Sequence, residues 1–317
     1  MPSLPGPFDN HNMIGRIARN HSNIKRHIAR GATGETSGME AGSVSTGEEI
    51  RLARLFDGDG NAVVVAIDHG LYNGPRPGFN DLPEAVRHLG AADAILVSPG
   101  MAGHVREAFK RRGSPAMIVR LNWGTQYATQ WDYHESRSVP VLSAAEAVAL
   151  GADVVLVGMS IRTGSEAVDA ENVEVVAQAV SQKRQAGVPI VGEVYPAGHE
   201  DLPPDERHDQ IAIGCRIVAE LGVDLVKTFY TGERFGEIVA ATPVPVLALG
   251  SRKLPRERDA LELAATAVRA GARGVVFGRN VIQARDPERF LLALRAIVRE
   301  GVAPEEAATR NGIPETD

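Results

Sequence analysis

The sequence predicts an α/β protein built as a single (β/α)8 barrel, the TIM-barrel fold, with an N-terminal extension. Three observations support this fold class. A short phrase, in which a glycine ends a helical stretch and an apolar strand follows at once, recurs along the chain. Eight apolar runs of strand length alternate with amphipathic helical stretches. The chain of 317 residues exceeds the length of about 250 that is typical of such a barrel, which leaves room for the extension.

The recurring phrase accounts for part of an unusually high glycine content, 33 of 317 residues. It occurs four times, with its glycine at Gly90, Gly151, Gly222 and Gly271, and more loosely at Gly187. Glycine accepts the left-handed conformation that often ends a helix. The apolar run that follows suits a strand buried on both faces. The repetition therefore predicts repeated αβ units.

The eight candidate strands share a short, apolar, β-branched composition. They cover residues 62–67, 93–98, 116–121, 153–158, 188–194, 224–229, 245–249 and 274–277. Helical patterns separate them, for example at 205–221, 255–270 and 286–300. Right-handed crossovers would close eight such units into a parallel barrel. The alternative, an open doubly wound sheet, usually carries Gly-x-Gly-x-x-Gly after its first strand, where this chain has Asp68-His69-Gly70.

The N-terminal residues 1–47 differ in composition from the barrel, which we expect to span 48–303 before a C-terminal tail at 304–317. Between His11 and Arg30 there are five basic residues and no acidic one, and a linker rich in Gly, Ser and Thr follows. We interpret this segment as a basic arm that packs on a neighbouring subunit. An arm that binds RNA or a membrane is the alternative.

Overall composition indicates a folded, cytoplasmic protein. The net charge of −6 argues against nucleic acid or an anionic membrane as the main partner. No apolar run approaches the roughly 20 residues that span a bilayer, and the polar N-terminus lacks a signal-peptide core. The single cysteine, Cys215, excludes an internal disulfide and lies in an apolar helical stretch typical of the core.

Candidate catalytic residues lie at the carboxyl ends of the predicted strands, where barrel enzymes carry their chemistry. Lys227 lies within the apolar sixth strand, where burial disfavours the ammonium and leaves an amine able to form an imine with a carbonyl. A lysine that reaches water or pairs with a carboxylate is the alternative. Asp68 and Tyr195 end the first and fifth strands and should converge on Lys227 as proton-transfer groups. Each could instead be structural.

A phosphate site is predicted in the loops after the seventh and eighth strands. Gly250-Ser251 and Gly278-Arg279 combine backbone N–H groups that an oxyanion can approach with a forked arginine donor. His69 is typical of a structural residue when taken alone, but we include it among the candidate substrate-binding residues.

Five strand-end motifs together resemble those of the archaeal-type class I fructose-bisphosphate aldolases and their relatives, the aminodideoxyheptulosonate synthases and the autoinducer-2 phosphate thiolase. The resemblance covers about residues 50 to 300. The motifs are Ile67-Asp-His-Gly70, Tyr195-Pro-Ala-Gly198, Val226-Lys-Thr-Phe-Tyr230, Leu249-Gly-Ser-Arg-Lys253 and Gly278-Arg-Asn-Val-Ile-Gln283.

The resemblance implies a (β/α)8 barrel that assembles into homo-oligomers, commonly decamers, and that works without a cofactor or metal. It implies that Lys227 forms the Schiff base, that Tyr195 is the acid/base residue and that Asp68 is the second proton-transferring group. A substrate phosphate would be held by Gly250, Ser251, Gly278 and Arg279.

Two positions depart from this pattern. Related fructose-bisphosphate aldolases often have tryptophan where this chain has Glu193 and arginine where it has Ala197, which weakens the case for a second phosphate site. The Asp-His-Gly segment reads closer to the thiolase branch, yet Tyr195 favours an aldol reaction over acyl transfer to coenzyme A.

Metal-binding patterns are weak in this sequence. Asp57-Gly-Asp-Gly-Asn61 resembles the start of a calcium loop, but Ala62 replaces the required glycine, so a tight turn is expected. The nine histidines lack metal-ligand spacing, which argues against a zinc-dependent aldolase.

The resulting hypothesis is a metal-independent class I aldolase, an aldehyde-lyase. It would act on a phosphorylated ketose similar to fructose bisphosphate and release a product similar to dihydroxyacetone phosphate. Thiolase or transaldolase chemistry on a related ketose phosphate is the alternative within enzymes. A sugar-phosphate sensor that has lost catalysis is the alternative outside them.

Overall fold

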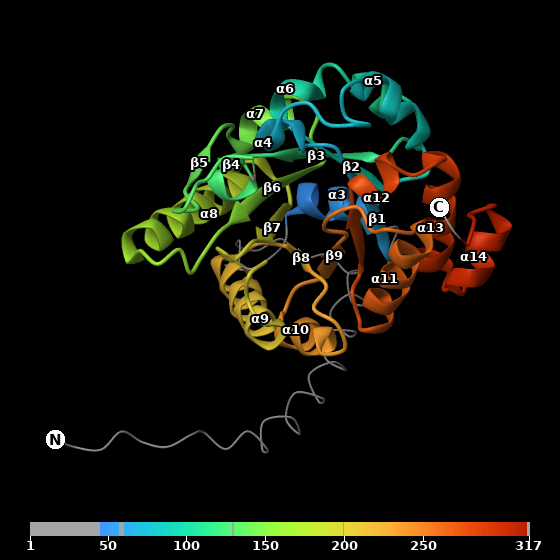
Figure 1. Cartoon of the computed structure of the whole chain (residues 1–317). Coiled ribbons are helices and arrows are strands. Elements are labelled where there is room, and N and C mark those ends of the chain that lie inside the picture. Colours follow the sequence, from blue (N-terminus) through green and yellow to red (C-terminus); the bar gives the residue numbers. More distant parts are fainter. Residues whose placement is uncertain (1–44, 57–59, 129, 199, 316–317) are drawn as a thin grey trace, which may run out of the picture. The chain divides into compact units, whose positions relative to one another are not determined.

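The computed structural model describes residues 45–56, 60–128, 130–198 and 200–315. Eight parallel strands close into a barrel in the order β1-β10-β9-β8-β7-β6-β3-β2 (Figure 1). This confirms the predicted fold class, and each predicted strand range holds one barrel strand. The strands are β1 (Ala62–Ala66), β2 (Ala94–Val97), β3 (Ala116–Arg120), β6 (Val154–Met159), β7 (Ile190–Val194), β8 (Leu225–Phe229), β9 (Val246–Leu249) and β10 (Gly274–Phe277).

Helices surround the strands and cover their outer face (Figure 1). The three helical ranges predicted above agree with α9, α11 and α13 to within two residues at each end. Short helices occupy the connections after β1, β2 and β10. The helices are α4 (Gly70–Asn73), α5 (Leu82–Ala85), α6 (Pro99–Ala102), α7 (Ala144–Ala149), α8 (Glu166–Ala186), α9 (Pro204–Leu221), α10 (Phe235–Ala241), α11 (Glu257–Arg269), α12 (Arg279–Ile282) and α13 (Pro287–Glu300).

Most glycines of the recurring phrase adopt the conformation expected of a helix end. Gly151, Gly222 and Gly271 have φ values of 102°, 101° and 100°, and Gly187 has a φ of 58°. Gly90 differs, because it follows a short 3₁₀ helix (Val86–His88) and its φ is not positive.

The same phrase contains an aspartate with a role that the sequence analysis missed. In three copies this aspartate stands directly before a strand, and its carboxylate accepts the backbone N–H of the neighbouring strand. The bonds are Val63 N to Asp93 Oδ2 (2.7 Å), Met117 N to Asp153 Oδ2 (2.9 Å) and Ile190 N to Asp224 Oδ2 (2.7 Å). Each carboxylate thus links the amino end of the strand that follows it to the neighbouring strand of the barrel.

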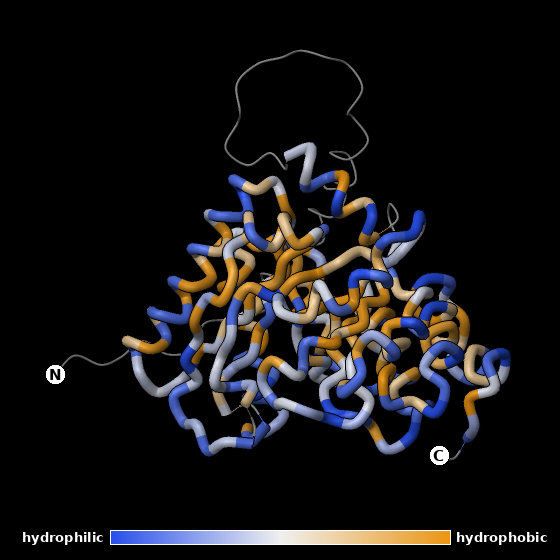
Figure 2. The backbone as a smooth tube through the Cα atoms, turned by 90° about the horizontal axis from the view of Figure 1, so that it is seen from above, coloured by the Kyte–Doolittle hydropathy of each residue, from blue (hydrophilic) through white to orange (hydrophobic). Residues whose placement is uncertain are grey.

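Helix α3 (Thr46–Phe56), which the sequence analysis did not predict, closes the amino end of the barrel. Its Leu55 and Phe56 pack with the side chains that fill the barrel interior. Arg54 pairs with Asp153, directly before β6. Hydrophobic segments lie in the interior of the described barrel, and hydrophilic segments lie on its outside (Figure 2).

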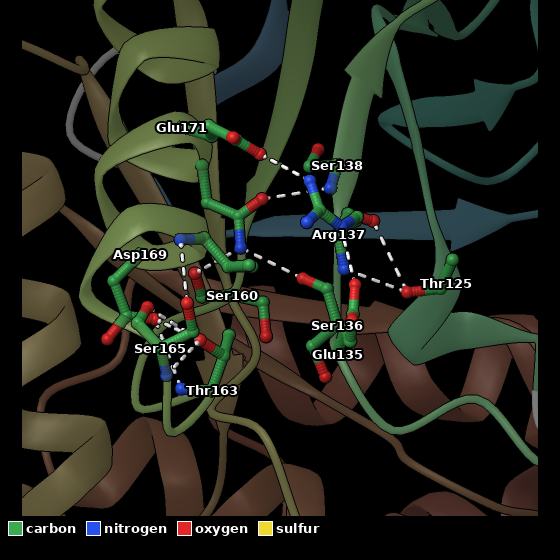
Figure 3. Close-up of polar contacts among 12 residues, drawn as sticks. Thr125, Glu135, Ser136, Arg137, Ser138, Ser160, Thr163, Ser165, Asp169 and Glu171 are labelled. Atoms are coloured by element: carbon green, nitrogen blue, oxygen red, sulfur yellow. Dashed lines mark hydrogen bonds and ion pairs between the residues drawn. The ribbon is translucent and has the colours of Figure 1, made fainter.

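A hairpin excursion at residues 122–140 follows β3 and is anchored to α8. Its strands β4 (Asn122–Gly124) and β5 (Ser138–Pro140) pair antiparallel. The buried Asn172 of α8 accepts the Ser138 N–H (2.8 Å) and donates to the carbonyls of Ser136 (2.8 Å) and Ser160 (3.0 Å). Arg137 also pairs with Glu171 of α8 (2.7 Å; Figure 3). The excursion is therefore held at its second strand.

The predicted C-terminal tail at 304–317 contains a helix that packs on the barrel. Helix α14 (Pro304–Arg310) packs against α11 and α13, and its Ala307 and Ala308 are fully buried.

Cys215 is also buried, and burial raises the pKa of its thiol to about 12, as expected of a core residue. In the described ranges we find no helix long and apolar enough to cross a membrane. Residues 1–44 of the predicted basic arm and residues 57–59 of the predicted turn lie outside the described residues, whereas residues 46 and 47 of the predicted arm belong to α3.

Candidate active site

A cavity of about 300 Å³ lies at the carboxyl ends of the barrel strands. Side chains or backbone from β1, β3, β7, β8, β9 and β10, or from the segments directly after them, line it. All of the candidate residues from the sequence meet there: Asp68, His69, Tyr195, Lys227, Gly250, Ser251, Gly278 and Arg279.

Lys227 faces this cavity from β8 and forms an ion pair with Glu193. The parallel register of β7 and β8 makes the two residues direct neighbours, and Lys227 Nζ lies 2.5 Å from Glu193 Oε1. Both side chains are buried. Lys227 is therefore a buried lysine that is paired with a carboxylate, which the sequence analysis gave as the alternative for this residue.

Arg120 at the end of β3 joins Glu193 to Asp68. Its Nε lies 2.6 Å from Asp68 Oδ2 and its Nη2 lies 2.6 Å from Glu193 Oε2, and only 2% of its surface is exposed. The guanidinium carbon lies over the rings of Tyr72 and Tyr127, 5.2 Å and 5.1 Å from their centroids. One arginine thus positions both carboxylates.

Tyr127 of the hairpin excursion completes the contacts of Glu193. Its hydroxyl donates to Glu193 Oε2 at 2.8 Å. Gly158 on β6 makes this possible, because a Cβ there would lie 2.3 Å from the Tyr127 hydroxyl and 3.2 Å from Arg120 Nη1. Because Gly158 has no side chain, Tyr127 and Arg120 can both reach Glu193 on β7.

The buried charges of this network balance. Burial by itself would raise the pKa of Glu193, but the positive charges of Arg120 and Lys227 hold that pKa well below its usual range. The pKa of Arg120 is raised well above its usual value by Glu193, Tyr72 and Asp68, against the effect of burial. Two acidic and two basic side chains, Asp68, Glu193, Arg120 and Lys227, thus form a buried cluster of zero formal net charge.

Tyr195 lies beside this network with its phenol protonated. Burial is the main cause that raises its pKa above the usual value, and Glu200 and Glu193 add to the shift. Its ring packs between Tyr127 and Phe229, with centroid distances of 4.8 Å and 5.1 Å. The hydroxyl therefore carries its proton at neutral pH and is available as a hydrogen-bond donor.

His69 is neutral near pH 7, because burial lowers its pKa to about 4. Its Nδ1 lies 4.0 Å from Asp68 Oδ1, and its ring packs on Phe79 at a centroid distance of 4.7 Å. It lines the cavity and packs against the core.

Arginines line the cavity from the segments after β1, β9 and β10. Arg279 donates to the carbonyl of Ser251 at 2.8 Å, and Ser251 has a φ of 53°. Burial, followed by the charge of Arg76 and a smaller effect of Arg252, lowers the pKa of Arg279. Arg252 lies 3.6 Å from Glu200. Three guanidinium groups against one carboxylate make this wall attractive to an anion.

Gly250 and Gly278 are required by close packing, and neither has a positive φ. A Cβ at Gly250 would lie 2.6 Å from the Phe277 ring. A Cβ at Gly278 would lie 2.3 Å from His69 Cε1 and 2.7 Å from the carbonyl of Ala66. These glycines therefore bring neighbouring groups together at the rim of the cavity.

Replacing Gly278 by alanine is expected to destabilise the fold by about 1–3 kcal/mol and to displace His69, because the Ala66 backbone cannot move aside cheaply. Urea unfolding measures the first effect, and affinity for inorganic phosphate measures the second. Gly100→Ala is the matched control, because a Cβ there meets nothing within 4 Å. Equal stability of the two variants would contradict this role of Gly278.

Several cavity residues escaped the sequence analysis. Arg120 could have been found, because it is a charged residue at the end of an apolar strand, just as Lys227 is a charged residue within one. Glu193 was noted only as a departure from a family pattern. Tyr72, Tyr127 and Arg76 lie outside any strand, and no local pattern marks them. In the described segments, no three His, Cys, Asp or Glu residues are grouped so that they could hold a metal ion.

Comparison with known proteins identifies the family. Residues 62–284 match the model of the DeoC/LacD family of aldolases, and the chain belongs to this family. It is 31% identical over 269 residues to an uncharacterised aldolase of Saccharolobus solfataricus, covering 82% of this chain and 97% of the relative. It is 33% identical over 262 residues to the 3-hydroxy-5-phosphonooxypentane-2,4-dione thiolase of Yersinia pestis, covering 82% and 85%.

A solved structure of an archaeal fructose 1,6-bisphosphate aldolase is similar to this chain, with a TM-score of 0.67 and 31% identity over 78% of this chain and 98% of that one. Another, described as a Schiff-base-forming fructose-1,6-bisphosphate aldolase, has a TM-score of 0.66 and 31% identity over the same shares. The sequence resemblance to this group is thereby confirmed, and the chain is an enzyme of an aldolase family.

Proposed function

We propose that this protein is a class I aldolase that cleaves or forms a carbon–carbon bond in a phosphorylated ketose through a Schiff base on Lys227. The observation that carries the proposal is the position of Lys227. It faces a cavity whose walls offer proton-transfer groups on one side and an arginine cluster on the other. The archaeal aldolases of similar structure support the same chemistry.

The proposed reaction begins when Lys227 Nζ attacks the ketone carbon and water leaves, which forms an iminium. The iminium withdraws electrons from the bond to be cleaved. Asp68 removes the proton of the substrate hydroxyl, since the phenol of Tyr195 already carries its own proton, and the carbon–carbon bond breaks. Tyr195, whose phenol is protonated at neutral pH, then protonates the enamine. Hydrolysis releases a product similar to dihydroxyacetone phosphate and restores Lys227.

The substrate phosphate would bind at the rim formed by Gly250, Ser251, Gly278 and Arg279, with His69 beside it. Arg279 can offer a forked pair of donors, and Arg76 adds positive charge. The metal-free reaction and the homo-oligomer expected from the resemblance are part of this proposal.

Thiolase chemistry on the same lysine is the second candidate, favoured by the similarity to the Yersinia pestis thiolase. Tyr195 supports the aldol reaction, because the thiolase branch that the sequence resembles lacks this tyrosine motif. Incubation with a ketose phosphate, with and without coenzyme A, separates the two. New acyl-coenzyme A would identify the thiolase.

Borohydride reduction tests the aldolase proposal directly. Reduction in the presence of fructose 1,6-bisphosphate or a ketose monophosphate should attach the sugar irreversibly to Lys227, detected by peptide mass spectrometry. Activity should be unchanged after treatment with a chelator. An unmodified Lys227 with every ketose phosphate, or activity lost to the chelator, would overturn the proposal.

A further inference from the structure

The cavity holds a buried carboxylate, Glu193, that the proposed reaction does not use. Asp68 and Tyr195 account for proton transfer to and from the substrate, yet Glu193 contacts the Lys227 amine directly, with 2.5 Å between Oε1 and Nζ. The strand register fixes this arrangement, because Glu193 and Lys227 are partners in the β7–β8 pairing. Glu193 therefore touches the reacting nitrogen itself.

We propose that Glu193 is a further catalytic residue, which relays the protons of the Lys227 nitrogen during imine formation and then serves as the counter-ion of the iminium. This inference rests on the proposed Schiff-base function.

The proton balance of imine formation fits such a relay. Lys227 begins as an ammonium with three protons on nitrogen. One passes to Glu193 Oε1, which frees the lone pair that attacks the ketone carbon. The neutral carbinolamine then loses water, and two of the three nitrogen protons leave with the former carbonyl oxygen. The third stays on the iminium nitrogen. Glu193 is ionised at the start and at the end.

The charge balance supports the counter-ion role. The buried cluster of Asp68, Arg120, Glu193 and Lys227 has zero net charge when the lysine is an ammonium. The iminium also carries one positive charge on the same nitrogen, so it keeps this balance, whereas a neutral imine would leave one negative charge uncompensated in a buried site. Such a charge is costly to bury.

Arg120 and Tyr127 act as positioning residues for this carboxylate. Both donate to Glu193 Oε2, at 2.6 Å and 2.8 Å, while Oε1 faces Lys227. Oε2 is thus occupied by two donors from other segments, and Oε1 is directed at the nitrogen.

Glu193→Gln is the central test, because it removes the charge and keeps the shape. Turnover of the ketose phosphate should fall at least about a hundredfold. The alkaline limb of kcat should move at least about one pH unit lower, because the iminium loses its counter-ion. Carbamylation of Lys227 by cyanate, which reacts only with neutral amines, should rise about tenfold or more at pH 7. Exposed Lys110 is the internal reference for the reagent.

Two further variants separate charge from packing. Tyr127→Phe removes one hydrogen bond to Glu193 but keeps its charge, so the shift of the alkaline limb and the rise in carbamylation should be much smaller than in Glu193→Gln. Glu193→Asp withdraws the carboxylate and should shift the limb in the same direction as Gln but less far. It also serves if Glu193→Gln does not fold.

Turnover and carbamylation together distinguish the proton relay from a purely structural role of Glu193. Lower turnover together with faster carbamylation supports the relay, because a structural defect would not activate the amine. Unchanged turnover and limb in Glu193→Gln, or equal carbamylation in Glu193→Gln and Tyr127→Phe, would overturn it. The carbamylation needs no substrate. If the original protein forms no Schiff base with any ketose phosphate, the proposed function fails by itself, while the Glu193–Lys227 pairing is still measured.

Discussion

Lys227→Met is expected to lower turnover of the ketose phosphate by roughly 10⁴- to 10⁶-fold, because the nucleophile is lost and no imine can form. Affinity for the phosphorylated ligand should fall far less, since Gly250, Ser251 and Arg279 are untouched. Glu193 keeps Arg120 and Tyr127 as partners, so the fold should persist, although the uncompensated negative charge of the cluster should lower its stability. Steady-state kinetics and calorimetric binding measure the two effects.

The control for this prediction is Lys110→Met, which replaces an exposed lysine whose partner is Glu107. Its turnover should equal that of the original protein. If Lys227→Met kept measurable turnover and borohydride attached the sugar to another lysine, the assignment of Lys227 would be wrong. Equal loss of affinity and turnover in Lys227→Met would instead indicate a binding role.

Arg120→Met is expected to have the largest effect on stability, about 3–5 kcal/mol at pH 7, because it leaves two buried carboxylates without their shared cation. The pH dependence has a definite sign. In the original protein the pKa of Glu193 is below its unfolded value of 4.5, so its stabilisation is present above pH 4.5 and declines as the pH falls below that value. In the variant that carboxyl should bind a proton more readily when folded, so the difference between the two proteins should shrink in acid.

Urea unfolding at pH 7 and at pH 5 checks this prediction. Arg87→Met is the control, because its ion pair with Glu84 is exposed and should contribute less than about 1 kcal/mol. If Arg120→Met lost no more stability than Arg87→Met, the buried network would not hold this end of the barrel together.

Most of the barrel could be predicted from the sequence because its signals are local. Each strand is a short apolar run, and glycines such as Gly151 and Gly222 end the preceding helices where the chain must turn. The hairpin excursion could not be predicted, because its strands have three residues each and β5 is held by Asn172, which is distant in sequence. No periodicity can mark such an element.

The sequence predicted those residues of the candidate site that lie at the ends of strands. Lys227, Asp68 and Tyr195 all line the cavity, because the carboxyl ends of parallel strands meet. The partners of Lys227 depend on register, since Glu193 reaches it only through the pairing of β7 with β8. Tyr127 reaches Glu193 only because Gly158 lacks a side chain. Contacts of this kind are properties of the assembled barrel.

Closure of the amino end by α3 has a consequence for the order of events in the proposed reaction. In the described part of the chain, Leu55, Phe56 and the inward strand side chains fill the barrel below the cavity. Substrate and products must therefore use the same mouth at the carboxyl ends. The aldehyde that is cut free would leave first, while the other fragment stays tethered to Lys227. In the synthetic direction the aldehyde would enter second, so product inhibition should follow an ordered pattern.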